Sequence, residues 1–128
     1  EAVKAEDEVA DVPIYDRAEN PYLAPDGTPS TIGVVGAESS RYQRAINKRT
    51  REVLKSRKRS RTDQDLIEGR MDLATAAVVR WHGWENEGKD WPCTPENVRA
   101  LLSAPHILSQ VEEAIEGHQR FFGNASKN

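Results

Sequence analysis

Proline and glycine between residues 13 and 36 constrain the fold of this chain more than any other feature of its sequence. Proline cannot continue a helix beyond its first turn and glycine weakens one, so this segment forms no long helix. The residues are Pro13, Pro21, Pro25, Gly27, Pro29, Gly33 and Gly36. Regular helices are therefore expected after residue 36, and residues 14–36 are expected to be β-rich or extended.

Pro25-Asp26-Gly27 is a strong turn signal within this segment. Proline fixes φ at the first corner of a turn, and glycine accepts the positive φ that follows. The turn predicts a short hairpin that pairs Tyr22 and Leu23 with the stretch from Thr31 to Val35. Two strands alone are marginally stable in water, so the hairpin has to pack on helices or on another chain.

Both ends of the chain differ from its centre in composition. Residues 1–13 carry many acidic side chains and almost no large apolar ones. Such a segment cannot offset the entropy lost on ordering, so we expect an acidic tail that is disordered or is ordered only by a partner. Residues 123–128 are expected to be disordered as well. A single α+β domain over residues 14–122 lies between the two tails, and its helical part covers residues 39–122.

The first two expected helices follow the proline-rich segment. Ser39 and Ser40 can cap a helix that runs to about Lys58. Thr62 forms a capping-box pattern with Asp65 and starts the second helix, which ends at Gly83 as its C-terminal cap. The apolar stripe of the first helix is Tyr42, Ala45, Ile46, Val53 and Leu54, and that of the second is Leu66, Ile67, Met71, Ala74, Ala77, Val78 and Trp81.

Two further helices are expected near the C-terminus. Thr94 is a suitable N-cap and Pro95 a suitable first residue for the third helix, and Pro105 opens the fourth. The apolar stripe of the fourth helix is Ile107, Leu108, Val111, Ala114, Ile115, His118 and Phe121 or Phe122. The expected fold class is mainly α (α+β): a C-terminal helical module of about four helices, with a short N-terminal β-hairpin and an extended acidic arm.

Composition excludes several classes of protein. No apolar run approaches the roughly 20 residues that cross a bilayer, so we expect no membrane span. The acidic N-terminus lacks the basic start and apolar stretch of a secretory signal. The chain has one cysteine, Cys93, so it forms no intrachain disulfide, and a reducing compartment is the default expectation.

We expect no catalytic, metal or cofactor site. The histidines at 82, 106 and 118 and the cysteine at 93 match no familiar zinc spacing, and no glycine-rich phosphate loop occurs. His82 is expected at the end of a helix, where it would interact with free carbonyl groups. His118 is expected to be a packing residue on an apolar stripe, and Cys93 a small buried filler at the start of a helix.

Charge is distributed unevenly along the chain, although the net charge is only −3. Residues 41–61 hold ten basic side chains and one acidic one, and acidic segments flank them on both sides. This basic patch indicates either a polyanionic partner or pairing with acidic protein surfaces. The basic side chains are Arg41, Arg44, Lys48, Arg49, Arg51, Lys55, Arg57, Lys58, Arg59 and Arg61.

Three tryptophans lie close together, at positions 81, 84 and 91. A tryptophan ring offers a large contact area and an N–H group that requires a partner. Trp81 is expected to pin the loop that follows it onto the helical core. Trp84 and Trp91 lie on the loop itself and are expected to be anchors at a protein interface, where tryptophan is over-represented.

Three stretches of the sequence resemble a known class of phage proteins. They are Val34 to Tyr42, Ala76 to Trp84, and Gly88-Lys89-Asp90-Trp91-Pro92-Cys93-Thr94-Pro95-Glu96-Asn97 leading to Leu101-Leu102. Together they resemble small proteins encoded in the tail-gene region of long-tailed bacteriophages, commonly labelled tail assembly chaperones. The resemblance covers roughly Ile14 to Phe122. The arginine-rich run from Arg57 to Arg61 and the acidic tail depart from it.

This resemblance implies a role in assembly. The protein would bind the long, helix-rich tape measure protein in the host cell cytoplasm, keep it soluble and help recruit tail tube subunits around it. Binding an amphipathic helix in an apolar groove is the recognition mode that fits such a partner. The expected partner-binding residues are Trp84, Trp91, Phe121 and Phe122.

Two alternatives stay open at this point. The chain can be a virion structural protein of the head or tail, whose N-terminal arm orders on neighbouring subunits. It can also bind nucleic acid through residues 41–61, although Tyr42 is the one aromatic side chain interleaved there and no recognition-helix motif follows. A homo-oligomer is compatible with each alternative.

Overall fold

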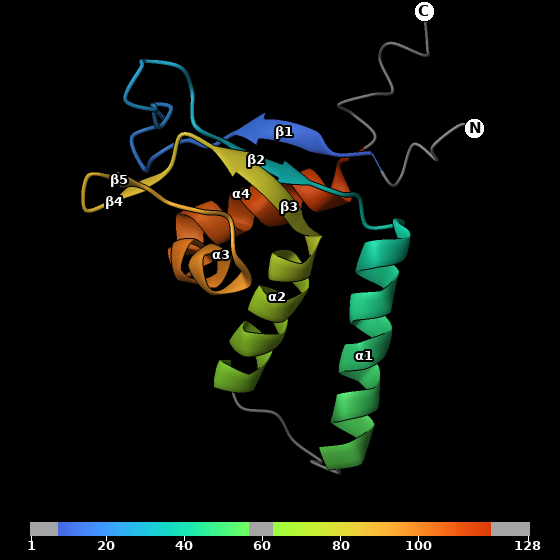
Figure 1. Cartoon of the computed structure of the whole chain (residues 1–128). Coiled ribbons are helices and arrows are strands. Elements are labelled where there is room, and N and C mark those ends of the chain that lie inside the picture. The colour runs from blue at the N-terminus through green and yellow to red at the C-terminus, as the bar shows by residue number, and fades with distance from the viewer. Residues whose placement is uncertain (1–7, 57–62, 119–128) are drawn as a thin grey trace, which may run out of the picture.

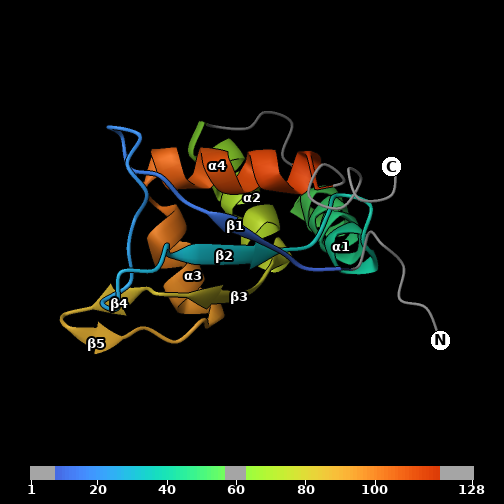
Figure 2. The same ribbon diagram turned by 90° about the horizontal axis from the view of Figure 1, so that it is seen from above.

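The computed structural model describes residues 8–56 and 63–118 of the chain, and all statements on structure refer to these residues. It contains four helices, a three-stranded antiparallel sheet and a small separate hairpin (Figures 1 and 2). The strands are β1 (Ala10–Pro13), β2 (Thr31–Val34), β3 (Val78–His82), β4 (Glu85–Asn86) and β5 (Lys89–Asp90). The helices are α1 (Ser40–Ser56), α2 (Asp63–Ala77), α3 (Pro95–Leu102) and α4 (Pro105–Glu116).

The sheet has the order β1-β2-β3, so β2 is central. Ile32 lies opposite Val12 on one side and Trp81 on the other, and Val34 lies opposite Ala10 and Val78. Because side chains alternate between the two faces of a strand, Ala10, Val12, Ile32 and Val34 share one face, and a register shift between Gly33 and Val34 lets Val78 lie opposite Val34 although it is three residues from Trp81. Helix α4 runs along this face, as the view from above shows (Figure 2). The fold class predicted from the sequence, α+β with four helices, is confirmed.

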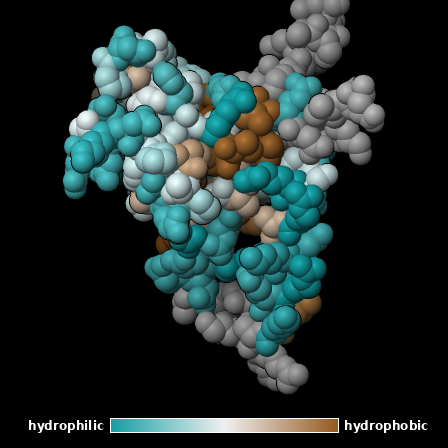
Figure 3. All heavy atoms as spheres, viewed as in Figure 1, coloured by the Kyte–Doolittle hydropathy of each residue, from teal (hydrophilic) through white to brown (hydrophobic). Residues whose placement is uncertain are grey.

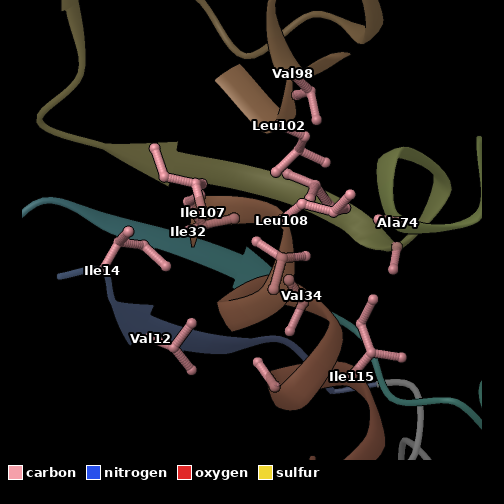
Figure 4. Packing of buried hydrophobic residues seen from close by; sticks show 14 of the residues in the cluster. Val12, Ile14, Ile32, Val34, Ala74, Val98, Leu102, Ile107, Leu108 and Ile115 are labelled. Atoms are coloured by element: carbon pink, nitrogen blue, oxygen red, sulfur yellow. The ribbon is translucent and has the colours of Figure 1, made fainter. Parts of the chain in front are cut away.

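One continuous core lies between the sheet and helices α3 and α4. Ile14, Ile32 and Val34 point from the sheet side toward Leu108 and Ile115 of α4 (Figure 4). All of these side chains are almost inaccessible to solvent. Leu102 closes the same core from α3. Burying large apolar side chains in this way is the main stabilising contribution in a domain of this size.

The opposite face of the sheet is open and is crossed by an ion pair. Asp11 of β1 and Arg80 of β3 form two hydrogen bonds, of 2.9 and 2.6 Å, above Gly33 of β2. A Cβ atom at Gly33 would lie 2.7 Å from Asp11 Oδ1 and 2.9 Å from Arg80 Cγ, so only glycine leaves room for the pair. Figure 3 shows a patch of apolar atoms over the sheet on this side.

The ion pair makes a small, pH-dependent contribution to stability. The hydrogen bond from Arg80 holds the pKa of Asp11 below its usual value. A carboxyl group whose pKa is lowered by folding stabilises the protein above its unfolded pKa, near 4, and this stabilisation is lost as the pH falls through the folded pKa. We therefore expect Asp11→Asn to lower the melting temperature at pH 7 by no more than a few degrees. The difference should disappear near pH 2, and an equal difference at both pH values would contradict the assignment.

Strand β1 corrects the predicted acidic tail. Residues 1–13 were expected to be disordered, but Ala10–Pro13 pairs with β2. Ala10 and Val12 are buried in this strand, and Asp11 and Pro13 are exposed. Two small apolar side chains at alternating positions suffice for an edge strand when the neighbouring strand supplies the hydrogen bonds. Residues 1–7 lie outside the described residues.

The predicted second helix ends earlier than expected. It was predicted to continue to Gly83, but α2 ends at Ala77 and Val78–His82 form β3. Val78 and Val79 are β-branched, which favours strands, and β2 offers an unpaired edge for them. Pairing with β2, which is remote in sequence, overrides the helical spacing of Val78 and Trp81. The positive φ of Gly83 serves a bend after a strand and not a helix cap.

The local signals at turns and helix starts are confirmed. The N–H group of Gly27 donates to the Ala24 carbonyl at 2.9 Å, which closes the predicted turn. Leu23 forms a bridge with Pro29, but the strand partners of β2 are β1 and β3 and not Tyr22-Leu23. The Thr94 hydroxyl accepts a hydrogen bond from the Asn97 N–H group and caps α3. Thr62 and Lys58 lie outside the described residues.

The predicted loop from Trp84 to Cys93 contains a tight hairpin. Strands β4 and β5 pair through Glu85 with Asp90 and Asn86 with Lys89. Glu87 and Gly88 between them both have positive φ, as a two-residue hairpin turn requires. Among residues 8–56 and 63–118, no helix is long and apolar enough to cross a membrane.

Candidate interaction surface on the α1–α2 arm

Helices α1 and α2 form an arm that projects away from the sheet and from α4 (Figure 1). The half of α2 near the sheet packs on the body of the protein through Met71, Ala74 and Ala77, which are buried. In α1, by contrast, none of residues 40–55 is buried. Because a helix of this length in a domain normally buries one face, the arm presents a surface that the described part of the chain leaves incompletely covered.

An ion-pair network fixes α1 to α2. The Arg49 guanidinium donates to the Asp72 carboxylate at 2.8 Å and to the Asp65 carbonyl at 3.3 Å. A Cβ atom at Gly69 would lie 3.1 to 3.2 Å from the Arg49 guanidinium, so the absence of a side chain there allows its close approach to α2. Arg49 therefore acts as a pin between the two helices.

The network also reaches α3. Arg99 donates to the second oxygen of Asp72 at 2.5 Å and forms an ion pair with Glu68. These acceptors hold the pKa of Arg99 above its usual value. Asp72 thus joins α1, α2 and α3 through two arginines. All these side chains are partly exposed, so the network contributes more to the angle between the helices than to overall stability.

Arg41 fixes the N-terminal end of α1 to the junction between α2 and β3. Its side chain donates to the carbonyl groups of Ala76 and Val78, at the junction between α2 and β3. Helix α2 has no basic residue in its own last turn. A cation is favourable near the C-terminus of a helix because the free carbonyl groups there carry partial negative charge. Arg41 of α1 supplies this cation.

A groove lies between α1 and α2, and the ion-paired Arg49 and Asp72 are among its lining residues. Its volume is about 360 Å³. We call it the arm groove; its lining residues are Ala45, Lys48, Arg49, Glu52, Asp72, Leu73 and Ala76. The α2 wall is largely apolar because it contains Leu73 and Ala76, and the α1 wall is largely charged. The groove therefore has one apolar wall and one charged wall.

Four cations form a line along α1 beside the groove. They stand at positions 44, 48, 51 and 55, spaced i, i+4, i+7 and i+11, which places them on one narrow sector of the helix. All four are exposed, and no ion pair of theirs is found within the described residues. We call Arg44, Lys48, Arg51 and Lys55 the cationic stripe. With a rise of 1.5 Å per residue, the stripe is about 16 Å long.

The predicted basic patch is therefore divided by the structure. Arg41 and Arg49 make contacts within the chain, and the four residues of the cationic stripe face solvent. Arg57, Lys58, Arg59 and Arg61 lie outside the described residues. The cationic stripe and Arg49 were predicted together, as one basic patch. The i, i+4, i+7 and i+11 spacing of the stripe is a sequence signal that distinguishes it from Arg49. Gly69 is a second signal, because a glycine within a helix can leave room for a side chain of a neighbouring helix such as Arg49.

The free end of the arm corrects two predicted core positions. Leu66 and Ile67 were expected on the buried face of their helix, but they are 57% and 41% exposed, and Leu54 of the partly buried α1 stripe is 71% exposed. Their spacing is that of an amphipathic helix, yet the body of the protein ends before it reaches them. Hydrophilic side chains cover most of the arm in Figure 3, with a small apolar area near its free end. Leu66 stands seven residues before Leu73 and so extends the apolar wall of the groove along α2.

The structure changes the roles expected for the tryptophans. Trp84 was predicted to be an interface anchor, but its side chain is 8% exposed and belongs to the core. Its indole N–H group donates to the Thr31 carbonyl of β2 at 2.9 Å, and the ring packs beside those of Tyr22 and Trp81. That prediction is wrong for the folded chain. Trp91 is half-buried, with its ring 5.4 Å from that of Trp81. Phe121 and Phe122 lie outside the described residues.

The histidines have hydrogen-bond partners, and the cysteine is partly buried. His82 lies on β3, where its ring nitrogen is 3.0 Å from the Thr28 hydroxyl, so its predicted place at a helix end is wrong. His118 is buried, as predicted for a packing residue, and its Nε2 lies 2.7 Å from the Glu8 carbonyl oxygen. Burial raises the pKa of the Cys93 thiol, which disfavours the reactive thiolate. In the described part of the chain, no group of three or more histidine, cysteine or acidic side chains is arranged to hold a metal ion.

Comparison with known proteins gives no relative: no family model matches the chain, and neither a curated protein nor a solved structure is significantly similar to it.

Proposed function

We propose that this protein is a non-catalytic tail assembly chaperone of a long-tailed bacteriophage, which holds an amphipathic helix of the tape measure protein in the arm groove. The observation that carries the proposal is the open groove beside α1, a helix in which none of residues 40–55 is buried. A third helix laid along the groove, over the Arg49–Asp72 ion pair, would cover part of the half-buried stripe of α1. The sequence resemblance to tail assembly chaperones supplies the identity of the partner.

Several features of the arm support a binding role of this kind. The network of Arg49, Asp72 and Arg99 fixes the angle between the helices before any partner binds. A preformed site binds more tightly than one that must be ordered first. The apolar α2 wall, with Leu73 and Ala76, suits the apolar edge of a helix in the helix-in-groove mode. Tail tube subunits would then assemble around the bound tape measure protein.

A substitution that fills the groove tests the proposal. Ala45 lines the groove, so Ala45→Trp places a large ring where the partner helix would lie. We expect at least a tenfold loss of tape measure fragments that copurify with the protein after co-expression, because a single buried steric conflict costs about 1.4 kcal/mol or more. Asn47→Trp is the matched control, since Asn47 is exposed two residues further along α1.

Two results would argue against this function. The first is an equal amount of copurified tape measure fragment for Ala45→Trp and for Asn47→Trp. The second is the presence of the protein in purified phage particles at a fixed number of copies. An assembly chaperone leaves before the particle is complete, whereas the alternative, a virion structural protein of the head or tail, stays in it.

A further inference from the structure

We infer that the arm selects a helix with an acidic flank, and that the cationic stripe beside the groove is the element that makes the selection. The inference rests on the proposed function, since it names the chemistry of the helix that the arm groove accepts. It concerns charge and orientation within the groove, which the proposed function leaves open. The residues that carry it are Arg44, Lys48, Arg51 and Lys55 on one side and Leu66 and Leu73 on the other.

The two walls of the arm groove differ in chemistry along their whole length. On α2, Leu66 and Leu73 are seven residues apart and lie on one side of the helix, and Ala76 follows Leu73 by about one turn. Leu66 is more than half exposed, and Leu73 and Ala76 are partly exposed. An apolar edge of a partner helix, with residues at i, i+3 or i+4 and i+7, would bury these side chains. Water loses contact with apolar surface on both partners, which favours binding.

On α1 the groove is bordered mainly by positive charge, although Glu52 and the ion-paired Arg49 also line it. Lys48 lines the groove itself, and Arg44, Arg51 and Lys55 stand on the same sector of α1 within two turns of it. A helix that lies along the arm has its own residues i, i+4, i+7 and i+11 on one side, with the same spacing as the stripe. Acidic residues at those positions would each face one cation. Such charge complementarity sets the orientation of a partner and excludes partners of the wrong charge.

A protein helix fits this surface better than a nucleic acid does. Phosphate groups would use the four cations, but they would leave Leu66 and the apolar α2 wall exposed to water. The stripe also carries no aromatic side chain on which a base could stack, because Arg44, Lys48, Arg51 and Lys55 are interleaved with aliphatic and polar residues. The combination of an apolar wall and a cationic border is therefore the feature that selects an acidic amphipathic helix.

The test uses the whole protein and two labelled synthetic peptides of about 21 residues. Both peptides carry the same apolar edge, and they differ in the flank, which has glutamate in one and lysine in the other at i, i+4, i+7 and i+11. We expect fluorescence anisotropy at about 50 mM salt to show the glutamate peptide binding at least tenfold more tightly. Most of this preference should be lost at about 500 mM salt, because the screening length falls below 5 Å.

Charge reversal on α1 supplies the decisive comparison. Arg44→Glu with Lys55→Glu reverses the two ends of the stripe and creates opposite-charge neighbours four residues apart, with Lys48 and Arg51, and circular dichroism of the variant checks that α1 stays helical. Two cations and two carboxylates then remain on the stripe, so we expect this variant to lose the preference and bind the two peptides about equally. Arg17→Glu with Lys89→Glu is the matched control: it changes the net charge equally at two exposed sites outside the arm, and it should bind both peptides as the unmodified protein does.

Three results would overturn the inference. They are equal binding of the two peptides, an unchanged preference in the Arg44→Glu/Lys55→Glu variant, and tighter binding of a 20-nucleotide single-stranded or duplex DNA than of the glutamate peptide. The proposed function and the inference can fail independently of each other. If tape measure fragments copurify but charge reversal has no effect, the function stands without charge selection; if the glutamate peptide binds but tape measure fragments do not, the selection stands without that partner.

Discussion

Replacing Trp84 by alanine is expected to lower the free energy of unfolding by about 3–5 kcal/mol, the range for removing a buried aromatic ring. The ring is 8% exposed and lies 5.4 Å from the ring of Tyr22 and 6.4 Å from that of Trp81. Its removal leaves a cavity beside these rings, and it also removes the hydrogen bond to the Thr31 carbonyl. Urea unfolding followed by circular dichroism measures the change.

Two control variants separate the contributions to this effect. Trp84→Phe keeps most of the ring but loses the N–H group, so about 1–2 kcal/mol is expected. Trp91→Ala removes a half-buried ring and should also cost about 1–2 kcal/mol. If Trp84→Ala were no more destabilising than Trp91→Ala, Trp84 would not be a core residue. The prediction that it is an anchor at a protein interface would then stand.

Replacing Gly83 by alanine is expected to cost about 2–4 kcal/mol, for two additive reasons. Gly83 has a φ of 83°, a conformation that residues with a side chain adopt at a cost of about 1–2 kcal/mol. A Cβ atom there would also lie 2.8 Å from the Ala24 Cβ atom and 3.0 Å from the Ser30 hydroxyl oxygen. Ser30 is buried and donates to the Gly83 carbonyl at 2.8 Å, so the neighbours have little freedom to move.

Gly88→Ala isolates the conformational part of this cost. Gly88 has a similar φ of 78°, but no heavy atom lies within 4 Å of the position that a Cβ atom would take. We expect about 1 kcal/mol for this variant. The difference between the two variants, measured by urea unfolding, is the cost of the contact with Ala24 and Ser30. Equal effects would mean that the bend after β3 is not packed as the structure describes.

What the sequence alone predicted well was local chemistry. Thr94 and Pro95 start α3 because a hydroxyl cap and a fixed φ act within a few residues of each other. The turn that ends at Gly27 follows from the same kind of short-range rule. Both depend on side chains and backbone groups that are neighbours in the chain. Such features can therefore be predicted from a few consecutive residues.

What the sequence did not predict depends on contacts between remote segments. Val78 and Trp81 have a spacing that suits a helix, but the edge of β2, more than forty residues earlier, takes Val78–His82 into the sheet. Leu54 and Leu66 continue the apolar stripes of their helices past the point where the body ends. No rule based on neighbouring residues says how far along a helix other elements pack on its apolar stripe. Trp84 is buried for the same reason, since its partner Thr31 lies on another strand.

The candidate site was predicted in part. The basic residues of α1 were identified from composition, but composition did not distinguish Arg49, which pairs with Asp72, from the solvent-facing stripe beside it. The groove itself was not foreseen, because it exists only once α1 packs beside α2, joined to it through Arg49 and Arg41. Helix-in-groove recognition was predicted, although with anchors on the tryptophan loop and not on the arm.

Hydrogen–deuterium exchange of the complex with a tape measure fragment tests the central claim most directly, because it reports where the partner covers the chain. Binding to the arm groove predicts slower exchange of backbone amides over residues 41–55 and 64–77, with little change over residues 85–92 of the hairpin. Slower exchange confined to the hairpin, or no change in the arm at saturating fragment, would contradict the assignment of the arm groove as the binding site.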